Sequence, residues 1–235
     1  MQIVKGFGLA TMIVVSAAMS IAQTPPQQIS IYPDSILNDV SNHPVGINVD
    51  FFMDNDDFLK PAHSTTEALK SMGVRYLRYP GGEKSDLYLF SSPPYDKAEP
   101  VPARKGKEAL QDYNRVVAPT YMQFNREVLN FDKYIEMCRE VGAEPVVVVA
   151  ADMYLLDLPP GNTLPTRDGL IKNAVEWVRY SNIKKKYNVK YWLIGNESWH
   201  KDNKNSTAEI YAHDVVEFSK AMKAVDPSIK TVANG

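Results

Sequence analysis

The fold is decided around one stretch in the last quarter of the chain, Val189-Lys190-Tyr191-Trp192-Leu193-Ile194-Gly195-Asn196-Glu197-Ser198-Trp199. Residues 191–194 form a short apolar, aromatic and β-branched run, which is typical of a strand buried on both faces. Gly195 ends this strand, and Asn196 and Glu197 follow where such a strand reaches the surface. Glu197 is therefore a candidate proton donor, and the alternative is a strand-end carboxylate that only accepts hydrogen bonds from nearby backbone.

Four other segments show the same kind of strand, and helical segments separate them. The expected strands are 45–52, 74–79, 145–151, 191–194 and 230–233. Helices are expected after the capping box at Ser64, over 131–141 before Gly142, after Thr166, and after a second capping box at Ser206. Buried strands that alternate with helices predict an α/β fold with a parallel sheet.

Two α/β architectures are considered for this pattern. A doubly wound nucleotide-binding sheet requires a glycine-rich phosphate turn, and neither G-x-G-x-x-G nor G-x-x-x-x-G-K-[ST] occurs. A (β/α)8 TIM-barrel type fits better, because polar and aromatic residues follow the strands, where the active sites of such barrels lie. The sequence holds only about five strand–helix units of the eight that a barrel needs, so we expect a truncated barrel.

The amino terminus has the pattern of an export signal. Lys5 supplies a positive charge, residues 8–18 form a short apolar core, and Ser20-Ile21-Ala22 fits the small-x-small cleavage site. We therefore expect a signal peptide at 1–22, a lead-in segment at 23–44 and a catalytic domain from 45 to 235, in a secreted or periplasmic protein. No stretch is long enough for a membrane span.

Charge and composition exclude several other classes. The net charge of -2 argues against nucleic acid as a partner. The single cysteine, Cys138, lies on an apolar helix face and is expected in the core. The acidic run 50–57 lacks the glycine and distal glutamate of a calcium loop, so we expect a solvated loop. The four histidines show no paired ligand spacing, and we expect no metal and no cofactor.

Polar and aromatic side chains follow each of the first four expected strands. They are Asn48 and Asp50, then Arg78 and Glu83, then Asp152 and Tyr154, then Asn196, Glu197 and Trp199. Sugar hydroxyls require polar partners of this kind, and the C–H face of a sugar ring stacks on aromatic rings. Glycoside cleavage adds an acid for the leaving oxygen, and retaining enzymes add a second carboxylate about 5–5.5 Å away. Partial burial and that negative partner would keep Glu197 protonated.

These residues also resemble a known family. The run from Lys190 to Glu197 looks like the fourth-strand signature of clan A retaining glycoside hydrolases, in which the Glu is the acid/base. Leu77-Arg78-Tyr79-Pro80-Gly81-Gly82 and Asp226-Pro227-Ser228-Ile229-Lys230 are most similar to the family 51 α-L-arabinofuranosidases. The similarity covers 45–235, the amino-terminal portion of such an enzyme, and implies a (β/α)8 glycosidase.

The resemblance implies roles for individual residues. Glu197 would be the acid/base, Asn196 would hold the hydroxyl beside the anomeric carbon, and Arg78 would brace the nucleophile's side of the pocket. Asp50 stands where the family usually has a sugar-binding Glu, and Glu83 where it usually has Asn. The family's nucleophile, a Glu that ends strand seven, is not in this sequence. Trp199 and Tyr154 are the further expected contacts to an oligosaccharide or polysaccharide.

Other functions remain open at this stage. Another clan A activity, such as a xylosidase or an endoglucanase, would use the same acid. A non-catalytic carbohydrate-binding fragment would hold sugar without cleaving it. His200 is a candidate substrate contact, and the aromatics of the long segment after strand two either line subsites or pack as an ordinary loop: Tyr88, Phe90, Tyr95, Tyr113 and Tyr121.

Overall fold

The computed structural model describes residues 45–103, 116–118, 123–157, 160–200 and 205–234. The expected signal peptide, 1–22, and the lead-in segment, 23–44, lie outside these residues. Within the described part of the chain, no helix is long and apolar enough to cross a membrane.

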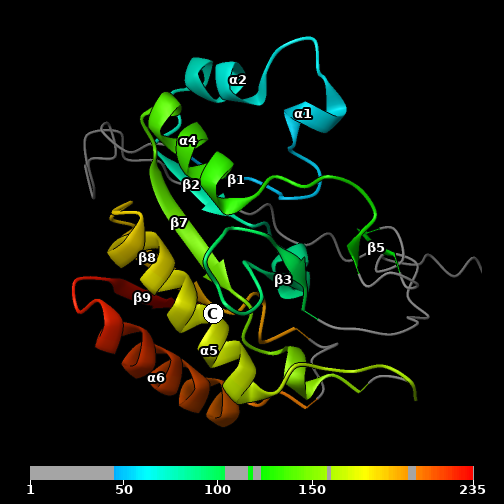
Figure 1. The fold of residues 1–235 in the computed structure, drawn as a ribbon. Coiled ribbons are helices and arrows are strands. Elements are labelled where there is room, and N and C mark those ends of the chain that lie inside the picture. The colour runs from blue at the N-terminus through cyan, green and yellow to red at the C-terminus, as the bar shows by residue number, and fades with distance from the viewer. Residues whose placement is uncertain (1–44, 104–115, 119–122, 158–159, 201–204, 235) are drawn as a thin grey trace, which may run out of the picture. The chain divides into compact units, whose positions relative to one another are not determined.

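A five-stranded parallel sheet organises the described residues (Figure 1). Its strands are β1 (Gly46–Asn48), β2 (Tyr76–Tyr79), β7 (Glu144–Val149), β8 (Tyr191–Ile194) and β9 (Lys230–Ala233), and they pair in that order. Every pairing is parallel, so the predicted α/β fold with a parallel sheet is confirmed. The spatial order of the strands follows the chain without a reversal.

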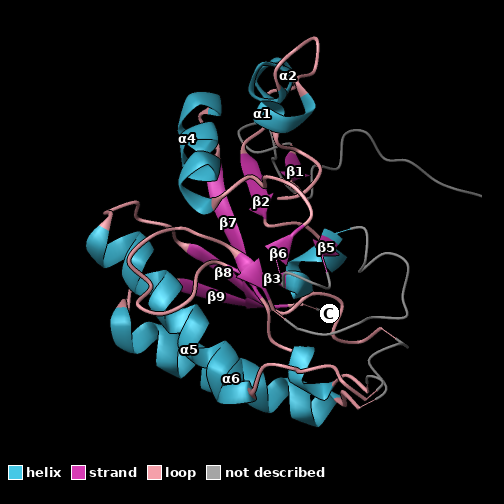
Figure 2. Cartoon of the chain, turned by 45° about the vertical axis from the view of Figure 1, so that its right-hand side comes forward, coloured by secondary structure: helices cyan, strands magenta, loops and turns pink. Residues whose placement is uncertain are grey.

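Helices pack on one face of the sheet, and the other face is less buried. The helices α4 (Phe131–Val141), α5 (Arg167–Val178) and α6 (Ala208–Val225) lie along one side of the strands (Figure 2). Side chains on the alternate strand positions are fully buried there, among them Leu77, Val147 and Trp192. On the opposite positions Arg78, Val146 and Tyr191 are only half-buried.

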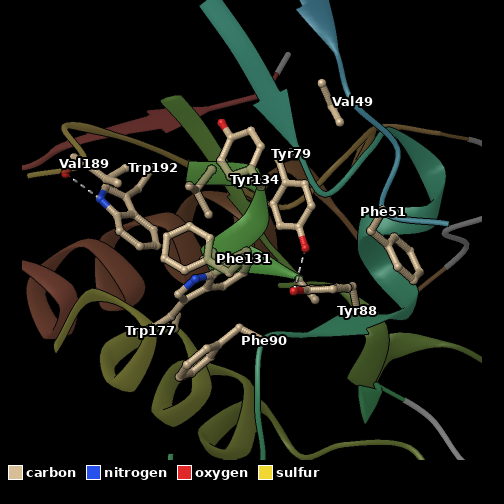
Figure 3. Packing of buried hydrophobic residues seen from close by; sticks show 14 of the residues in the cluster. Val49, Phe51, Tyr79, Tyr88, Phe90, Phe131, Tyr134, Trp177, Val189 and Trp192 are labelled. Carbon is tan, nitrogen blue, oxygen red and sulfur yellow. Dashed lines mark hydrogen bonds between the residues drawn. The ribbon is translucent and has the colours of Figure 1, made fainter. Parts of the chain in front are cut away.

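The core is built on aromatic side chains beside α5 (Figure 3). The Trp177 ring stacks on Phe90 at 5.4 Å between centroids and meets Phe131 edge-on at 5.3 Å. Tyr88 is buried as well, and its hydroxyl is 2.7 Å from that of Tyr79. Tyr88 and Phe90 are therefore core residues rather than subsite residues, and Tyr95 stacks on Phe90 at 6.0 Å. Tyr113 and Tyr121 lie outside the described residues.

The first strand is shorter than the predicted 45–52. Asp50 Oδ1 accepts hydrogen bonds from the backbone N–H of Phe52 (2.8 Å) and Met53 (3.1 Å), and Asp54 Oδ2 accepts from the Asp50 N–H (2.8 Å). These carboxylates take backbone donors that a strand would need, so the chain turns at 51–53. The prediction of a solvated acidic loop was also wrong in part, because burial raises the pKa of Asp54. The turn leads into α1 (Asp56–Leu59).

Side chains and glycines set the helix ends. Ser64 and Glu67 form the predicted capping box of α2 (Thr65–Ser71), and Gly142 ends α4 in the left-handed region at φ 75°. The predicted second box was wrong by one residue. Thr207, not Ser206, caps α6 by accepting from the N–H of Ile210 at 3.3 Å. The predicted burial of Cys138 on α4 is confirmed, and burial raises the pKa of its thiol to about 12.

Short elements fill the segments between the strands. A 3-10 helix, η1 (Glu83–Leu87), precedes two small antiparallel pairs: β3 (Tyr88–Leu89) with β4 (Val101–Pro102), and β5 (Val117–Ala118) with β6 (Gln123–Phe124). A second 3-10 helix, η2 (Met153–Leu155), follows β7, and a π-helical turn, η3 (Arg179–Lys184), extends α5. Of these elements, only η3 lies in a segment predicted to be helical, as the end of the helix after Thr166.

Candidate active site

The candidate site lies at the carboxyl ends of the parallel strands. Because the strands are parallel and in register, residues that follow them meet along one edge of the sheet. Asn48 ends β1, Arg78 lies near the end of β2, and Asp152 follows β7. Asn196 and Glu197 follow β8. The sheet thus brings together polar residues from four strand ends that the sequence predicted to share one rim.

Arg78 connects three of these strand ends. Its Nη1 donates to Asn48 Oδ1 (2.9 Å) and to the Gly81 carbonyl (2.6 Å), and its Nη2 donates to Asn196 Oδ1 (2.8 Å). Burial lowers the pKa of Arg78, and the negative charges of Asp86 and Glu197 oppose that shift. The guanidinium stays charged, because arginine is not deprotonated in proteins. Asn196, only 6% exposed, is therefore fixed through its carbonyl oxygen, and its amide N–H groups can donate to a ligand.

Glu197 lies in a tight turn directly after β8. Its own φ is 47° and that of Gly195 is 72°, so two residues of this turn are in the left-handed region. For a glutamate that conformation is uncommon, and such residues gather at functional sites when their surroundings hold them. The side chain is exposed, so the expected partial burial was wrong. The turn carries Glu197 past the last paired residue of the sheet, onto its open edge.

Asp152 lies buried behind this turn, with 3% of its surface exposed. Burial raises the pKa of its carboxyl group to about 6. The negative charge of Asp214 also raises this pKa, whereas a hydrogen bond from the Ser198 side chain lowers it. Its second oxygen, Oδ2, is buried without a hydrogen-bond partner among the described residues. Asp152 therefore supports the backbone of the Glu197 turn from within the protein.

Of three expected sugar-binding residues, Asp50, Tyr154 and Glu83, the first two have structural partners. The Asp50 carboxylate binds its own turn and pairs with Lys84 at 3.3 Å. The Tyr154 hydroxyl donates to Asp214 Oδ2 at 2.6 Å, and burial together with this hydrogen bond raises the pKa of Tyr154 to about 12. Glu83 is exposed at the start of η1. Asp50 and Tyr154 are thus partly occupied in holding the loops, and Glu83 is accessible.

Trp199 is the exposed aromatic residue of the site. Its surface is 64% exposed, and its ring centroid is 6.1 Å from that of His200, which is half-buried. An indole that is exposed in this way, two residues after Glu197, presents an apolar face to solvent. This is the arrangement in which an aromatic ring can stack on the C–H face of a sugar.

No metal site is built from the described residues, since no three His, Cys, Asp or Glu side chains among them lie close enough to hold an ion. The polar groups at the edge of the sheet are carboxylate, amide and guanidinium groups from different strands. Such a set can exchange protons and bind hydroxyl groups.

Sequence reasoning missed three residues of the site, Ser198, Tyr211 and Asn234. Asn234 is the first residue after β9, whose last residue Ala233 pairs with Ile194 of β8, and the rule that polar residues after strands face the site would have found it. Tyr211 comes from α6, and Ser198 contacts Asp152 and Asn234 across the turn. No pattern in the sequence distinguished Tyr211 or Ser198 from ordinary helix and loop residues.

Comparison with known proteins gives the family. A model described as alpha-L-arabinofuranosidase 1 domain matches residues 68–235. Alpha-L-arabinofuranosidase C of Emericella nidulans is 29% identical over 185 residues, which cover 72% of this chain and 31% of that protein. The intracellular exo-alpha-(1->5)-L-arabinofuranosidase of Acetivibrio thermocellus is 26% identical over 200 residues, covering 77% of this chain and 33% of that protein.

A solved structure supports the same relationship. A crystal structure described as that of an arabinofuranosidase superposes with a TM-score of 0.52 at 26% identity, covering 83% of this chain and 41% of that one. The chain spans about a third of the length of the curated relatives that it matches. The family model covers well over half of the chain, and its span contains Arg78, Asn196 and Glu197. The chain therefore belongs to the α-L-arabinofuranosidase 1 domain family, in agreement with its resemblance to the family 51 enzymes.

Proposed function

We propose that this chain carries the acid/base half of the active site of a retaining α-L-arabinofuranosidase, which acts on arabinofuranosides of plant cell-wall polysaccharide. The supporting observation is the bridge from Arg78 to Asn48 and Asn196, directly beside Glu197 at the edge of the sheet. The bridge immobilises the amide that precedes the proposed acid. A carboxylate that only capped its own strand would not need such a fixed neighbour.

Glu197 acts twice in the proposed reaction. In the first step its carboxylic acid gives a proton to the glycosidic oxygen, while a second carboxylate attacks the anomeric carbon and the carbon–oxygen bond breaks. In the second step Glu197, now ionised, takes a proton from the water that attacks the anomeric carbon of the glycosyl-enzyme. The bond between this carbon and the second carboxylate breaks, the carboxylate leaves, and the acid form of Glu197 is restored. The second carboxylate is the Glu that the family resemblance places at the end of strand seven.

The neighbouring residues bind the sugar. Asn196, fixed through its oxygen by Arg78, donates from its amide nitrogen to the hydroxyl beside the anomeric carbon. Trp199 stacks on the ring or on the leaving group, as its exposure allows. Asp50, Glu83 and Tyr154 contact hydroxyls farther from the bond that is cleaved.

We also infer that the five-stranded sheet belongs to a (β/α)8 barrel, with the catalytic domain starting at residue 45. Parallel strands in chain order, with helices on one face, are what the amino-terminal part of such a barrel contains. On the face away from the helices, Tyr76 and Tyr191 meet edge-on at 6.2 Å and remain half-buried. This face corresponds to the barrel interior, which further strands would cover.

We propose export as the protein's fate, with residues 1–22 as the signal peptide and a secreted or periplasmic location. The basis is the residue pattern around Lys5 and Ser20-Ile21-Ala22. Amino-terminal sequencing of the protein recovered from outside the cytoplasm tests this proposal. A mature chain that begins after Ala22 is expected, and an uncleaved Met1 would contradict it.

Two other functions make different predictions. A xylosidase or endoglucanase would use the same Glu197 chemistry but cleave aryl xylosides or glucan chains faster than aryl arabinofuranosides. A non-catalytic binding fragment would retain arabino-oligosaccharides in affinity electrophoresis and release no reducing sugar. Assays of the complete gene product on the three substrate types separate these functions.

Glu197→Gln in the complete gene product tests the acid/base role. The amide cannot act as the acid that protonates the leaving oxygen. For substrates with poor leaving groups, the first step should therefore slow by about 100-fold or more, because general acid catalysis contributes roughly 10²–10⁴-fold to the rate. Activated aryl leaving groups need little protonation, and their release should be nearly unaffected in that step. Pre-steady-state release of the aryl alcohol is the measurement.

The matched control is Glu83→Gln, an exposed carboxylate on η1 that the mechanism does not use as an acid. It should change the rate for both leaving groups by the same factor. Wild-type rates of Glu197→Gln on both substrate types would show that Glu197 is not the acid.

A further inference from the structure

The turn that carries Glu197 is closed by a side chain from the neighbouring strand. Asn234, directly after β9, accepts a hydrogen bond from the backbone N–H of Ser198 through Oδ1 at 2.9 Å. Its Nδ2 donates to the carbonyl of Ile194, the last residue of β8, at 2.9 Å. One amide group thus contacts the backbone on both sides of residues 195–197.

Tyr211 of α6 contacts both Ile194 and Asn234. Its hydroxyl donates to the Ile194 carbonyl (2.8 Å) and accepts from the Asn234 backbone N–H and side-chain Nδ2, both at 2.7 Å. The one proton and two lone pairs of a phenol are all used in this way. Asn234 Nδ2 also lies 3.1 Å from Ser198 Oγ, so its two hydrogens are shared among three acceptors. The side chain of Asn234 is therefore fixed in one orientation.

Gly195 allows these groups to converge. A Cβ at this position would lie 2.8 Å from Ser198 Oγ, 3.2 Å from Asp152 Oδ1 and 3.3 Å from Asn234 Nδ2. The turn therefore has polar side chains from β7, β9 and itself packed against its backbone, in space that any larger residue would occupy. Residue 195, at φ 72°, therefore has room only for glycine.

We propose that Asn234 is a positioning residue for the acid/base: by closing the turn between Ile194 and Ser198, it sets the direction in which Glu197 points. The proposal rests on the proposed function, because it assigns Asn234 to the reaction only through Glu197. Asn234 itself touches neither substrate nor the reacting atoms. Arg78 fixes Asn196 from the side of β2, and Asn234 fixes Ser198, on the other side of Glu197, from the side of β9.

Asn234→Ala in the complete gene product removes the side-chain amide and leaves the strand pairing of β9 unchanged. A small displacement of a catalytic group costs up to about 100-fold in rate, so kcat should fall roughly 10- to 100-fold with little change in KM. The deuterium exchange of the Ser198 amide, which loses its acceptor, should become at least ~10-fold faster. The control is Ser219→Ala, which removes a 3.0 Å hydrogen bond between α6 and β9 at Thr231, away from the turn. It should leave both quantities unchanged.

Asn234→Asp supplies a readout that simple destabilisation would not give. A protonated carboxyl can donate to the Ile194 carbonyl as Nδ2 does, whereas a carboxylate would face that carbonyl without a proton. The kcat of the variant, divided by that of the wild type at the same pH, should therefore rise as the pH is lowered. The titratable groups around this position are Asp152 after β7, Tyr211 and Asp214 of α6, and Glu197 itself. They are common to both proteins, so the change of the ratio with pH comes from the carboxyl group at 234 and from its charge acting on them.

The outcomes separate the two proposals. Unchanged kcat and unchanged Ser198 exchange in Asn234→Ala, with Glu197→Gln impaired, would overturn the role of Asn234 and leave the proposed function intact. A flat ratio for Asn234→Asp across pH would overturn it as well. If Glu197→Gln kept wild-type rates, the proposed function would fail, and Ser198 exchange alone would then decide whether Asn234 closes the turn.

Discussion

At the scale of single residues, the Asp152 carboxyl is a buried acidic group with a raised pKa. It is buried behind the Glu197 turn, with one oxygen near Ser198 and the other without a partner among the described residues. Its pKa of about 6 lies above the ordinary value of 3.8, and burial is the main cause. Ionisation of Asp152 therefore opposes folding.

The sign of the effect follows from proton binding. Between pH 4 and pH 6 the folded chain keeps the proton on Asp152 and the unfolded chain releases it, so stability falls as the pH rises through this range. At about 1.4 kcal/mol per pKa unit, the total loss is about 3 kcal/mol. In Asp152→Asn this loss is absent, because the amide does not titrate. The difference in stability between wild type and variant should change by about that amount from pH 4 to pH 7.5.

Thermal unfolding at several pH values measures this difference, and a constant offset from the new buried amide cancels between them. Asp157→Asn serves as the control, since Asp157 is exposed on the loop after η2. It should shift the unfolding temperature equally at all pH values. Parallel pH profiles for wild type and Asp152→Asn would show that the Asp152 carboxyl ionises normally.

At the scale of the elements, Gly142 shows how one backbone angle ends a helix. Its φ of 75° follows the last residue of α4, and a Cβ there would meet no atom within 4 Å. Only backbone strain opposes a side chain, so Gly142→Ala should cost about 1 kcal/mol of stability. Gly142→Asn should cost less, because asparagine tolerates the left-handed region. Denaturant midpoints of the three proteins test the ranking, and equal midpoints for both variants would contradict it.

Elements that follow from local chemistry were predicted well. The run from Tyr191 to Ile194 is a strand with the predicted limits, because four apolar or β-branched residues followed by glycine leave few alternatives. The capping box at Ser64 was also correct, since its hydrogen bonds are local. At Ser206 the same motif failed, because Thr207 next to it is an equally good cap and the sequence does not rank them.

Elements that leave no periodic pattern in the sequence were not predicted. The end of β1 is set by Asp50 and Asp54, whose carboxylates bind backbone in a turn that reads as a continuing strand. The pairs β3–β4 and β5–β6 are only two residues per strand, too short for any periodicity. In the site, the sequence placed Arg78, Asn196 and Glu197 on one rim. It did not find Asn234, whose role depends on the distance between β8 and β9.

At the scale of the whole sheet, the exposure of its faces and edges predicts the solubility of residues 23–235 when they are expressed alone. One face is buried under helices, while Tyr76, Tyr191 and Leu193 are half-buried on the other. The outer edges of β1 and β9 have no neighbouring strand among the described residues. Edges of this kind pair with other chains, so residues 23–235 expressed alone should be poorly soluble and inactive on aryl glycosides.

Size-exclusion chromatography and an aryl arabinofuranoside assay of residues 23–235 provide the test. Aggregates without activity are expected. A monomer that unfolds cooperatively and cleaves the substrate would contradict both the barrel and the need for a second carboxylate outside these residues.

The chain order of the strands has a consequence for synthesis on the ribosome. Within this sheet, each of β2, β7, β8 and β9 pairs with the previous strand of the sheet, so each of these strands finds its partner already translated. A sheet of this kind can grow in the direction of translation, and at every stage the most recent strand is the growing edge. That newest edge, together with the outer edge of β1, is where a chaperone would have to bind to prevent premature association.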